Sequence, residues 1–405
     1  MKKKHLVLVT TWFPPTNGVA VNRMDAFVKY FDKSKMDVSV ITLKKDADSL
    51  SFEKMYDADV YRLSNNSFFK LAEFNKGHSR LTHIAKVAWN YFVRTLIKHP
   101  LAKWMKGVNQ QLELLHKEHP IDVVITSSSP VECHWAVKAF LQKYNSVNWV
   151  ADARDELSLN PHLDEVLKSD CQQLEQFINK RANILTTVSK PIADDFSRLC
   201  PAIKVYEIRN GHQLNLPSIA DYKFNKIFTI VYAGTFYGAR KPDNFFKGLE
   251  QFIARGENIK NVQIRFVGTP KNFNYSFDKN IQIEFVEQCS YGEACKFQMD
   301  ADANLLILPK LEAKGVYSGK LFDYLAACKP IIAVVDTTDV AAKLINDCNA
   351  GYVADFDNVN DIEAAIEAAY QHWQSKTMLN CDRTKIEQLH RKYQVEKLNQ
   401  LIDSL

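Results

Sequence analysis

The sequence predicts an α/β protein built from two doubly wound parallel-sheet domains joined by a linker. Three observations support this prediction: the length of the chain, a repeated series of short apolar runs, and one interruption of that series at mid-chain. A chain of 405 residues exceeds what one core usually organises, so two domains of roughly 200 residues each are expected. Its 46% hydrophobic and 24% charged residues are typical of an ordinary folded soluble protein.

The first half of the chain contains the first series of predicted strands. Short apolar runs separated by stretches with helical spacing indicate strand–helix–strand units, whose parallel sheet is buried on both faces. The runs are HLVLVT, VSVIT, DVVITS, NWVAD and ILTTVS. They predict an N-terminal Rossmann-like domain over residues 1–212.

The alternating pattern stops over residues 213–226, which contain Pro217 and show no sustained periodicity, so this segment is the predicted linker. A second series then predicts a C-terminal domain over residues 227–383. Its runs are FTIVYAGTF, VQIRFVG, IQIEFV, ANLLILP, PIIAVV and GYVADF. We expect residues 384–405 to form an amphipathic helix that packs back toward the N-terminal domain. Paired domains of this type bind ligands at the carboxyl ends of their strands, in a cleft that the two sheets share.

Composition and spacing exclude several classes of protein. The eight cysteines are scattered, without a C-x-x-C pair or a matching histidine spacing, so neither a zinc site nor a disulfide framework is indicated. The start, MKKKHLVLVTTWFPP, has too few apolar residues for a signal-peptide core. No apolar run approaches the roughly 18 residues of a membrane span. We therefore expect reduced thiols in the cytoplasm and only peripheral contact with a membrane.

The stretch YAGTFYGARKPDNF directly follows a predicted strand. It supplies Gly234 and a second glycine, then Arg240 and Lys241, and a candidate helix start at Asp243. Glycines let the backbone approach a ligand closely, and cations beside a helix start suit a phosphate. The alternative is an ordinary strand-to-helix turn whose Arg–Lys pair is solvated.

The stretch GVYSGKLFDYLAACKPIIAVV contains the second half of this candidate site. Ser318 and Gly319 place backbone amides at a helix start, where the helix dipole favours an anion, and Lys320 adds positive charge. Asp323 lies one turn further along, so its carboxylate can accept hydrogen bonds from a diol. An anion beside a diol describes the phosphate and ribose of a nucleotide. The alternative for Asp323 is an acid on the solvated face of a surface helix.

The stretch WVADARDE places charged side chains after a strand of the N-terminal domain, where we expect them to project into the ligand cleft. Asp155, ahead of Asp152, is our candidate for orienting or deprotonating an acceptor hydroxyl or for stabilising positive charge on a sugar. Arg154 would orient one of the two carboxylates. The alternative is an Arg–Asp ion pair that holds a loop in place.

The segment 68–108 is basic and aromatic. Such a composition on amphipathic helices fits an interfacial membrane surface. It also fits nucleic acid, but the net charge is only +5 and no nucleic-acid motif accompanies it, so we expect no nucleic-acid partner. The alternative is that the aromatic residues belong to a core and the lysines to a solvated face. The residues concerned are Lys70, Lys76, Arg80, Lys86, Arg94, Lys98, Lys103 and Lys106, one acid, Glu73, and Phe68, Phe69, Phe74, Trp89, Tyr91, Phe92 and Trp104.

These motifs, in their order and spacing, resemble glycosyltransferase family 4, whose members have the GT-B architecture of two Rossmann-like domains facing a cleft. The resemblance extends through nearly the whole chain, and its wording is similar to the branch that builds bacterial surface polysaccharides such as capsule, O-antigen or exopolysaccharide. It is carried by TWFPPTNGVAVNRM, WVADARDE, RANILTTVSKPIADDF, VYEIRNGHQ, YAGTFYGARKP and SGKLFDYLAACKPIIA.

The resemblance implies a retaining hexosyl- or N-acetylhexosaminyltransferase that uses a nucleotide sugar and requires no metal or other cofactor. The acceptor would be a lipid-linked or soluble glycan, and a polyprenol-diphosphate-linked one would bring the enzyme to the cytoplasmic face of the inner membrane. The basic aromatic segment would be its docking surface.

The resemblance also implies roles for individual residues. Lys241 would hold the donor diphosphate and neutralise the leaving group, with Arg240 beside it in the turn that Gly234 begins. Asp323 matches the second acid of the E-x7-E motif, which grips the ribose hydroxyls. Gly18 matches the glycine loop that closes over the donor phosphates.

In the helix start, the resemblance places the amides of Ser318, Gly319 and Lys320 against the donor phosphates.

The chain departs from the family pattern in three places. The first acid of E-x7-E would fall at Gly315, so its contact with the donor sugar is missing or is made by another residue such as Glu312. Thr235 stands where many members have a phosphate-binding arginine. Where many relatives have a histidine after DVVITSS, this chain has SSSP, with Ser128 in the motif and His134 several residues on.

These departures leave two questions open. His134 is either a contact near the reacting centre or a helix-face residue. The protein is either a working transferase or a catalytically degenerate nucleotide-sugar-binding partner in a polysaccharide assembly complex. A sugar-nucleotide epimerase on the same fold has no support in the motifs.

Overall fold

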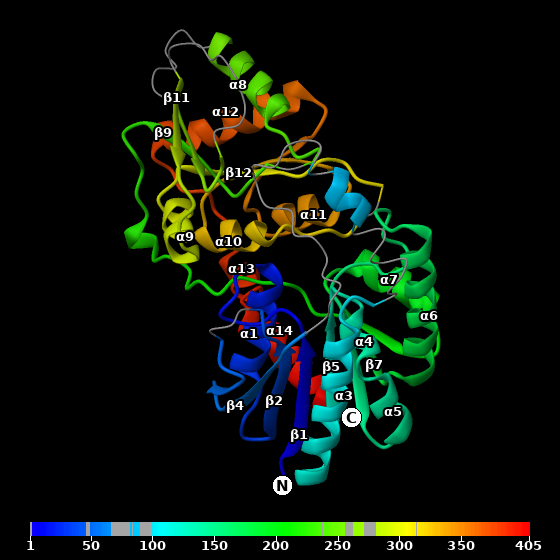
Figure 1. The fold of residues 1–405 in the computed structure, drawn as a ribbon. Coiled ribbons are helices and arrows are strands. Elements are labelled where there is room, and N and C mark those ends of the chain that lie inside the picture. Colours follow the sequence, from blue (N-terminus) through cyan, green and yellow to red (C-terminus); the bar gives the residue numbers. More distant parts are fainter. Residues whose placement is uncertain are drawn as a thin grey trace. The chain divides into compact units, whose positions relative to one another are not determined.

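The structure is a computed structural model, and it describes residues 2–45, 49–65, 82, 84–89, 99–236, 238–255, 262–270, 281–312 and 314–405. The chain divides into two compact units, the first formed by Met1–Ile208 with Val395–Leu405 and the second by Arg209–Gln394. Each unit consists of a sheet covered by helices (Figure 1).

The first unit contains a sheet of eight strands in the described part of the chain, in the order β3-β4-β2-β1-β5-β6-β7-β8. Every described pair in this sheet is parallel except β3 with β4. Its elements are β1 (Lys4–Thr10), α1 (Val19–Tyr30), β2 (Met36–Leu43), β3 (Phe52–Met55), β4 (Ala58–Leu63), α3 (Ala102–Glu118), β5 (Val123–Ser128), α4 (Glu132–Trp135), α5 (Lys138–Lys143), β6 (Asn148–Ala153), α6 (Glu165–Arg181), β7 (Ile184–Thr187), α7 (Lys190–Leu199), β8 (Lys204–Glu207) and most of α14 (Arg391–Asp403).

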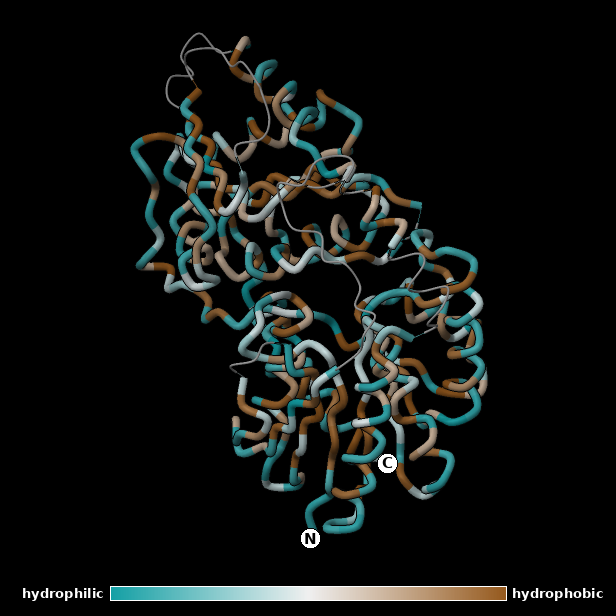
Figure 2. Tube along the Cα trace, viewed as in Figure 1, coloured by the Kyte–Doolittle hydropathy of each residue, from teal (hydrophilic) through white to brown (hydrophobic). Residues whose placement is uncertain are grey.

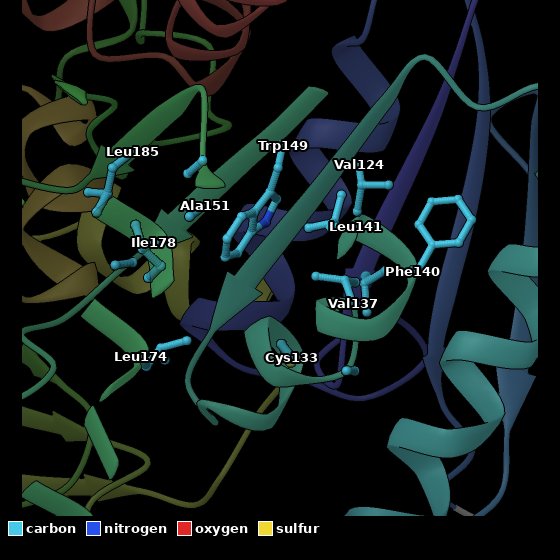
Figure 3. Packing of buried hydrophobic residues seen from close by; sticks show 14 of the residues in the cluster. Val124, Cys133, Val137, Phe140, Leu141, Trp149, Ala151, Leu174, Ile178 and Leu185 are labelled. Atoms are coloured by element: carbon cyan, nitrogen blue, oxygen red, sulfur yellow. The ribbon is translucent and has the colours of Figure 1, made fainter. Parts of the chain in front are cut away.

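The two faces of this sheet bury separate cores, because successive side chains of a strand point to opposite faces. In β1, Val7 belongs to the core shared with α3, α4, α5, α6 and α7, whereas Leu8 belongs to the core shared with α1 and α14. Trp149 of β6 is completely buried in the first of these cores (Figure 3). Leu398 of α14 packs in the second, so the last helix completes the first unit.

The second unit contains a sheet of six strands among the described residues, in the order β11-β10-β9-β12-β13-β14, with parallel pairing throughout. Counted along this unit, that is the order 3-2-1-4-5-6 of a dinucleotide-binding fold. Its elements are a 3-10 turn (Ile219–Asp221), β9 (Phe228–Ala233), α8 (Asp243–Arg255), β10 (Val262–Val267), β11 (Ile281–Val286), α9 (Tyr291–Met299), β12 (Ala303–Ile307), α10 (Gly319–Ala327), β13 (Ile331–Val335), α11 (Val340–Asp347), β14 (Gly351–Asp355), α12 (Val359–Ser375) and α13 (Arg383–Glu387).

The second sheet is also covered on both faces. Ile230 of β9 lies in the core formed with α8 and α12, and its neighbour Val231 lies in the core formed with α10, α11 and α13. Figure 2 shows the consequence in the sequence: hydrophobic residues concentrate on the strands, and hydrophilic residues recur along the helices.

The predicted fold class of two doubly wound parallel sheets is confirmed, and every apolar run in the two predicted series forms a strand. Three further strands, β3, β4 and β8, are not predicted. The turn between β3 and β4 explains one failure, because Tyr56 and Asp57 both have positive φ, 53° and 57°. Such hairpin turns usually contain Asn-Gly or Asp-Gly, so the sequence signal for the hairpin is absent.

Gly351, at the start of β14, faces the backbone of β13, and a Cβ at this position would lie 2.2 Å from the carbonyl oxygen of Ile331. We expect Gly351→Ala to lower the free energy of unfolding of the second unit by about 3 kcal/mol, because backbone atoms must move. Gly292→Ala in α9 is the matched control, since a Cβ there meets nothing within 4 Å. It should be neutral or stabilise by up to about 1 kcal/mol. Urea unfolding with hydrogen exchange of β13 and β14 measures both, and equal effects would contradict the prediction.

Candidate active site

Two segments of the second unit meet at its topological switch point, where β9 and β12 are neighbours but lead to opposite sides of the sheet. Gly234 follows β9 with a φ of 119°, and a Cβ there would lie 3.0 Å from Lys320 Nζ. Lys320 belongs to the first turn of α10, and its Nζ lies 3.8 Å from the centroid of the Tyr232 ring. The turn therefore requires glycine, and the amine is packed between the turn and an aromatic face.

Lys320 has an unusual charge equilibrium. Burial, together with the positive charge of Arg240, lowers the pKa of Lys320 to about 7. Arg240 is half-buried in the loop that precedes α8, so two cationic side chains lie in the same neighbourhood. An anion bound beside them would favour the protonated amine.

In the rest of the loop before α8, Thr235 and Phe236 contact Tyr232, whereas Lys241 is exposed. The Tyr232 hydroxyl donates to the carbonyl oxygen of Thr235 at 3.4 Å, and the Phe236 ring stacks on the Tyr232 ring with centroids 4.3 Å apart. Lys241, in contrast, is exposed and forms no ion pair within the described residues. Its side chain is therefore available to a ligand of the second unit.

The start of α10 presents backbone donors. Ser318 is the N-cap residue and is mostly buried, and its hydroxyl makes no capping hydrogen bond with the described residues. The amide of Lys320, at the second position of the helix, lacks the partner that a capping side chain usually supplies, and the amide of Gly319 is one of the first-turn donors without a partner inside the helix. Together with the partial positive charge of the helix start, they suit an anion.

Asp323 is buried, with 7% of its surface exposed, so it is not an acid on a solvated helix face. The Tyr291 hydroxyl donates to Asp323 Oδ1 at 2.7 Å. Burial raises the pKa of Asp323 to about 6, although the Tyr291 hydrogen bond and the Arg391 charge both act to lower it. This carboxyl group therefore changes charge close to neutral pH.

Tyr291 is a site residue that the sequence motifs do not identify. It is the first residue of α9, which starts with a capping box: the Ser290 side chain accepts from the Glu293 amide, and the Glu293 carboxylate accepts from the Ser290 amide at 2.9 Å. The pattern S-x-x-E shortly after the run IQIEFV is the signal for this helix start. It would have placed Tyr291 at the strand ends of the sheet.

Gly315, where the family resemblance predicts the first acid of E-x7-E, has a φ of 100°. Its amide donates to Asp339 Oδ1 at 2.8 Å. A side chain at this φ would be strained, so this backbone conformation favours glycine at the position. Glu312, three residues earlier, is exposed.

In the first unit, the structure differs from the expectation that Asp152 projects from the sheet edge. Asp152 is completely buried, and Arg23 donates to both of its oxygens, from Nη2 at 2.7 Å and from Nε at 3.1 Å. Ser127 and Thr186 add hydroxyl donors at 2.7 Å and 2.8 Å. Burial acts to raise the pKa of Asp152, but Arg23 and the hydroxyl donors hold it below its usual value. Both oxygens of the Asp152 carboxylate therefore already accept hydrogen bonds from side chains of the fold.

Asp155 is the accessible carboxylate of the same stretch. It is exposed, and its charge lies within electrostatic reach of Arg154. Arg154 donates to the carbonyl oxygens of Ser128, at the end of β5, and Ser129, the latter at 2.9 Å. Arg154 thus holds the loop after β5 and stands beside Asp155.

His134 is a completely buried residue of α4. Thr126 Oγ1 accepts a hydrogen bond from Trp149 Nε1 at 2.8 Å and shares a second hydrogen bond with His134 Nδ1 at 2.6 Å. Burial lowers the pKa of His134 to about 4. The structure therefore places His134 in a core, as a neutral histidine.

Gly18 is the N-cap residue of α1, with a φ of 144°, and a Cβ at this position would meet nothing within 4 Å. The α1 start has no side-chain cap among the described residues.

Most of the basic aromatic segment lies outside the described residues. Of its described aromatic residues, Trp104 is completely buried in a core, and Trp89 is 42% exposed. Ile84 and Val87 are exposed beside Trp89. Among the described residues, none of the helices combines the length and hydropathy needed to cross a membrane.

Solved structures that share the fold are glycosyltransferases and related proteins. A sucrose-phosphate synthase from Thermosynechococcus elongatus has a TM-score of 0.63 at 13% identity, over 99% of both chains. A trehalose-6-phosphate protein from E. coli, bound with UDP-2-fluoro glucose, has a TM-score of 0.58 at 11% identity, over 98% of this chain and 96% of that one. The lipopolysaccharide outer core galactosyltransferase WaaB has a TM-score of 0.59 at 13% identity, over 99% of both chains.

No family model and no curated protein sequence matches the chain. The structural likeness spans almost all of each chain, and it establishes that this protein has the GT-B fold, as the sequence predicts.

The buried pair of Arg23 and Asp152 generates a stability prediction. Asp152→Asn should lower the free energy of unfolding of the first unit by about 3–5 kcal/mol, because Arg23 stays buried without its counter-charge. The lowered pKa of Asp152 stabilises the fold fully above the unfolded-state value of about 4, and this contribution is lost as the pH falls through the folded-state value. Urea unfolding at pH 7 and at pH values from 4 down to 2 measures both effects, because the pH-dependent loss develops below the unfolded-state pKa. Asp155→Asn, at an exposed position, is the control and should change stability by less than about 0.5 kcal/mol.

Proposed function

We propose that the protein is a retaining glycosyltransferase that moves a sugar from a nucleotide-sugar donor to a glycan acceptor. The observation that carries the proposal is the arrangement at the switch point of the second unit. Lys320 is packed against the Gly234 turn beside Arg240, and the buried Asp323 lies one turn along the same helix. Cations beside backbone donors suit a diphosphate, and a buried carboxylate suits the ribose hydroxyls.

The departing nucleoside diphosphate is an anion, so the enzyme must above all stabilise the negative charge that develops on it. Lys241 is exposed, and Arg240 is half-buried next to Lys320. We assign the stabilisation of the leaving group to these cations and to the amides at the start of α10, because fixed donors stabilise developing charge more than the ground state. With the charge met by protein groups, the proposed reaction needs no metal ion.

For the acceptor hydroxyl we propose Asp155. Of the two candidate carboxylates in this stretch it is the exposed one, whereas Asp152 is completely buried and bonded to Arg23. Arg154 stands beside Asp155 and would orient it.

We further propose that the protein belongs to family 4 and that its acceptor is a lipid-linked glycan of bacterial surface-polysaccharide synthesis. The likeness to WaaB, a lipopolysaccharide galactosyltransferase, supports this context. The enzyme would act at the cytoplasmic face of the inner membrane. The exposed Ile84, Val87 and Trp89 support a docking role for the basic aromatic segment.

A donor screen tests the activity. The full chain is mixed with UDP, GDP and other nucleotide sugars, and thermal stabilisation is compared with release of nucleoside diphosphate. One donor should both stabilise the protein and be slowly hydrolysed. Stabilisation without turnover, even with lipid-linked acceptors present, would instead indicate a nucleotide-sugar-binding partner.

Lys241→Ala should lower kcat by about 100-fold with the donor so identified, which corresponds to about 3 kcal/mol of barrier for a lost electrostatic donor. Lys247→Ala is the matched control, because Lys247 is an exposed lysine of α8. A loss of less than about threefold in Lys241→Ala would show that another group meets the leaving-group charge.

Donor affinity should be highest between about pH 6 and pH 7. Asp323 must be ionised to accept from ribose hydroxyls, and its pKa is raised to about 6. Lys320 must be protonated to attract the diphosphate, and its pKa is lowered to about 7. A nucleotide sugar lacks the phosphate monoester that titrates near 6, so its charge is constant over this range. Calorimetry between pH 5 and pH 9 measures the profile.

Three variants separate the two limbs of this pH profile. Asp323→Asn should remove the rise near pH 6, and Lys320→Met should remove the fall near pH 7. Tyr291→Phe should move the rise to higher pH, because the Tyr291 hydrogen bond lowers the pKa of Asp323. A profile that is the same in all three variants would place the donor elsewhere.

Vesicle flotation tests the docking surface. Binding should be stronger on anionic than on neutral vesicles, because basic residues near a membrane are attracted by about 1 kcal/mol each. Replacing Lys86, Lys103 and Lys106 with Gln should weaken it. Equal flotation on both lipids, with the parent protein and the variant alike, would remove the membrane role.

A further inference from the structure

The second unit has an open sheet edge at β14. This strand is the last in the order of the six-stranded sheet, and among the described strands it pairs with β13 alone. Backbone groups on the outer side of such a strand are unpaired and can template the addition of another strand. Many edge strands resist this with Lys or Pro, and the edge strand β3 of the first sheet has an exposed Lys54. The sequence of β14, GYVAD, contains neither residue type.

The hydrogen bonds at the two ends of β14 identify which of its residues face outward. The Ala350 carbonyl oxygen accepts from an amide of β13 at 3.0 Å, and the Phe356 amide donates to a carbonyl oxygen of β13 at 2.9 Å. In a parallel sheet, alternate residues of a strand bond to opposite neighbours. The amides and carbonyl groups of Gly351 and Val353 therefore point away from β13.

A groove of about 540 Å³ lies beside this outer edge. Its volume is within the range of ligand sites, roughly 300–1,000 Å³. The strand contributes Gly351 and Val353 to the lining, and α11 contributes Asn346. On α12 the lining includes Ala364 and Ala365, whose small side chains leave room for a second chain next to the strand.

One carboxylate gives the groove its charge. Asp361, in the first turn of α12, is exposed and is the single charged side chain among the described residues that line the groove. Its amide donates to Asn358 Oδ1 at 3.4 Å, but its carboxylate has neither a hydrogen bond nor an ion pair with the residues that the structure describes. The groove therefore favours an occupant with a positive charge over an anionic one.

The backbone groups and the charge together select the class of occupant. An extended peptide supplies amides and carbonyl groups in the spacing that an open strand edge requires, and its alternate side chains can enter the groove. A small cation would leave the outward groups of Gly351 and Val353 without partners. A second copy of this chain, paired edge to edge, would bring a second Asp361 to the same interface, where like charges repel.

We propose that β14 binds an extended basic segment of another protein by strand addition, with a lysine or arginine of that segment paired with Asp361. Main-chain hydrogen bonds to Gly351 and Val353 attach the segment, and the Asp361 carboxylate selects its charge. The proposal does not depend on the proposed glycosyltransferase activity, because it uses neither the turn with Gly234 nor the start of α10.

Hydrogen exchange with defined peptides tests the proposal. The full chain is titrated with an end-blocked peptide of alternating Val and Lys, about six residues long, which is the usual length of a strand. Saturation should slow exchange of the Gly351 and Val353 amides by at least about tenfold, because new hydrogen bonds protect them. A peptide of alternating Val and Glu should bind about threefold to fivefold more weakly, the effect of one partly exposed ion pair. The Val–Lys peptide with methylated backbone nitrogens should not bind.

Two variants separate the charge from the strand pairing. Asp361→Asn should bind the Val–Lys and Val–Glu peptides equally, and the fold should tolerate it because the position is exposed. Glu367→Gln is the matched control, since Glu367 is an exposed acid of the same helix outside the described groove lining, and it should keep the preference. Val353→Pro should lose the peptide but keep the bonds to β13, because the amide that it removes points outward.

The proposal is overturned if neither peptide slows exchange at β14, or if the parent protein binds both peptides equally. Exchange at β14 that slows with rising protein concentration in the absence of peptide, together with a dimer in sedimentation, would assign this edge to a second copy of the chain and would also overturn it.

Discussion

The Lys320 amine, packed between the Gly234 turn and the face of Tyr232, is the interaction around which the candidate site is arranged. Burying an amine beside Arg240 lowers its pKa to about 7, because desolvation and like charge both disfavour the ammonium form. A bound anion would reverse both effects. The same helix buries Asp323 with a raised pKa. Buried groups of this kind reduce stability, and proteins retain them where binding compensates.

The two units use buried charge in different ways. In the first unit, Asp152 receives four hydrogen bonds from three side chains, so its charge is compensated within the fold. In the second unit, Lys320 is compensated by an aromatic ring alone among the contacts described above, and Asp323 by one hydroxyl and a more distant charge. The Asp152 carboxylate is thus a structural group that links strands, whereas Lys320 and Asp323 keep charge that a ligand could pair with. Both carboxylates follow a similar pattern in the sequence, a charged residue near the end of a strand or the start of a helix.

Much of the fold follows from local patterns. Buried parallel strands are continuous apolar runs, and each sheet alternates its side chains between two cores, as Val7 with Leu8 and Ile230 with Val231 show. The hairpin of β3 and β4 is not predictable in this way, because its turn residues do not carry the usual glycine. For the candidate site, local motifs predict the turn with Gly234 and the start of α10, and the structure places Lys320 of that helix against that turn. Tyr291 was not, because its role depends on a hydrogen bond to a residue 32 positions away.

The sequence by itself determined the two doubly wound sheets, the turn after β9, and the cations and small residues at the start of α10. These features depend on residues close together along the chain, where periodicity and turn chemistry act. Only the tertiary structure decided which charged groups are exposed. It placed Asp152 in a buried network, left Asp155 in solvent and buried His134. Burial and charge pairing join residues that are distant in sequence, so no local pattern contains them.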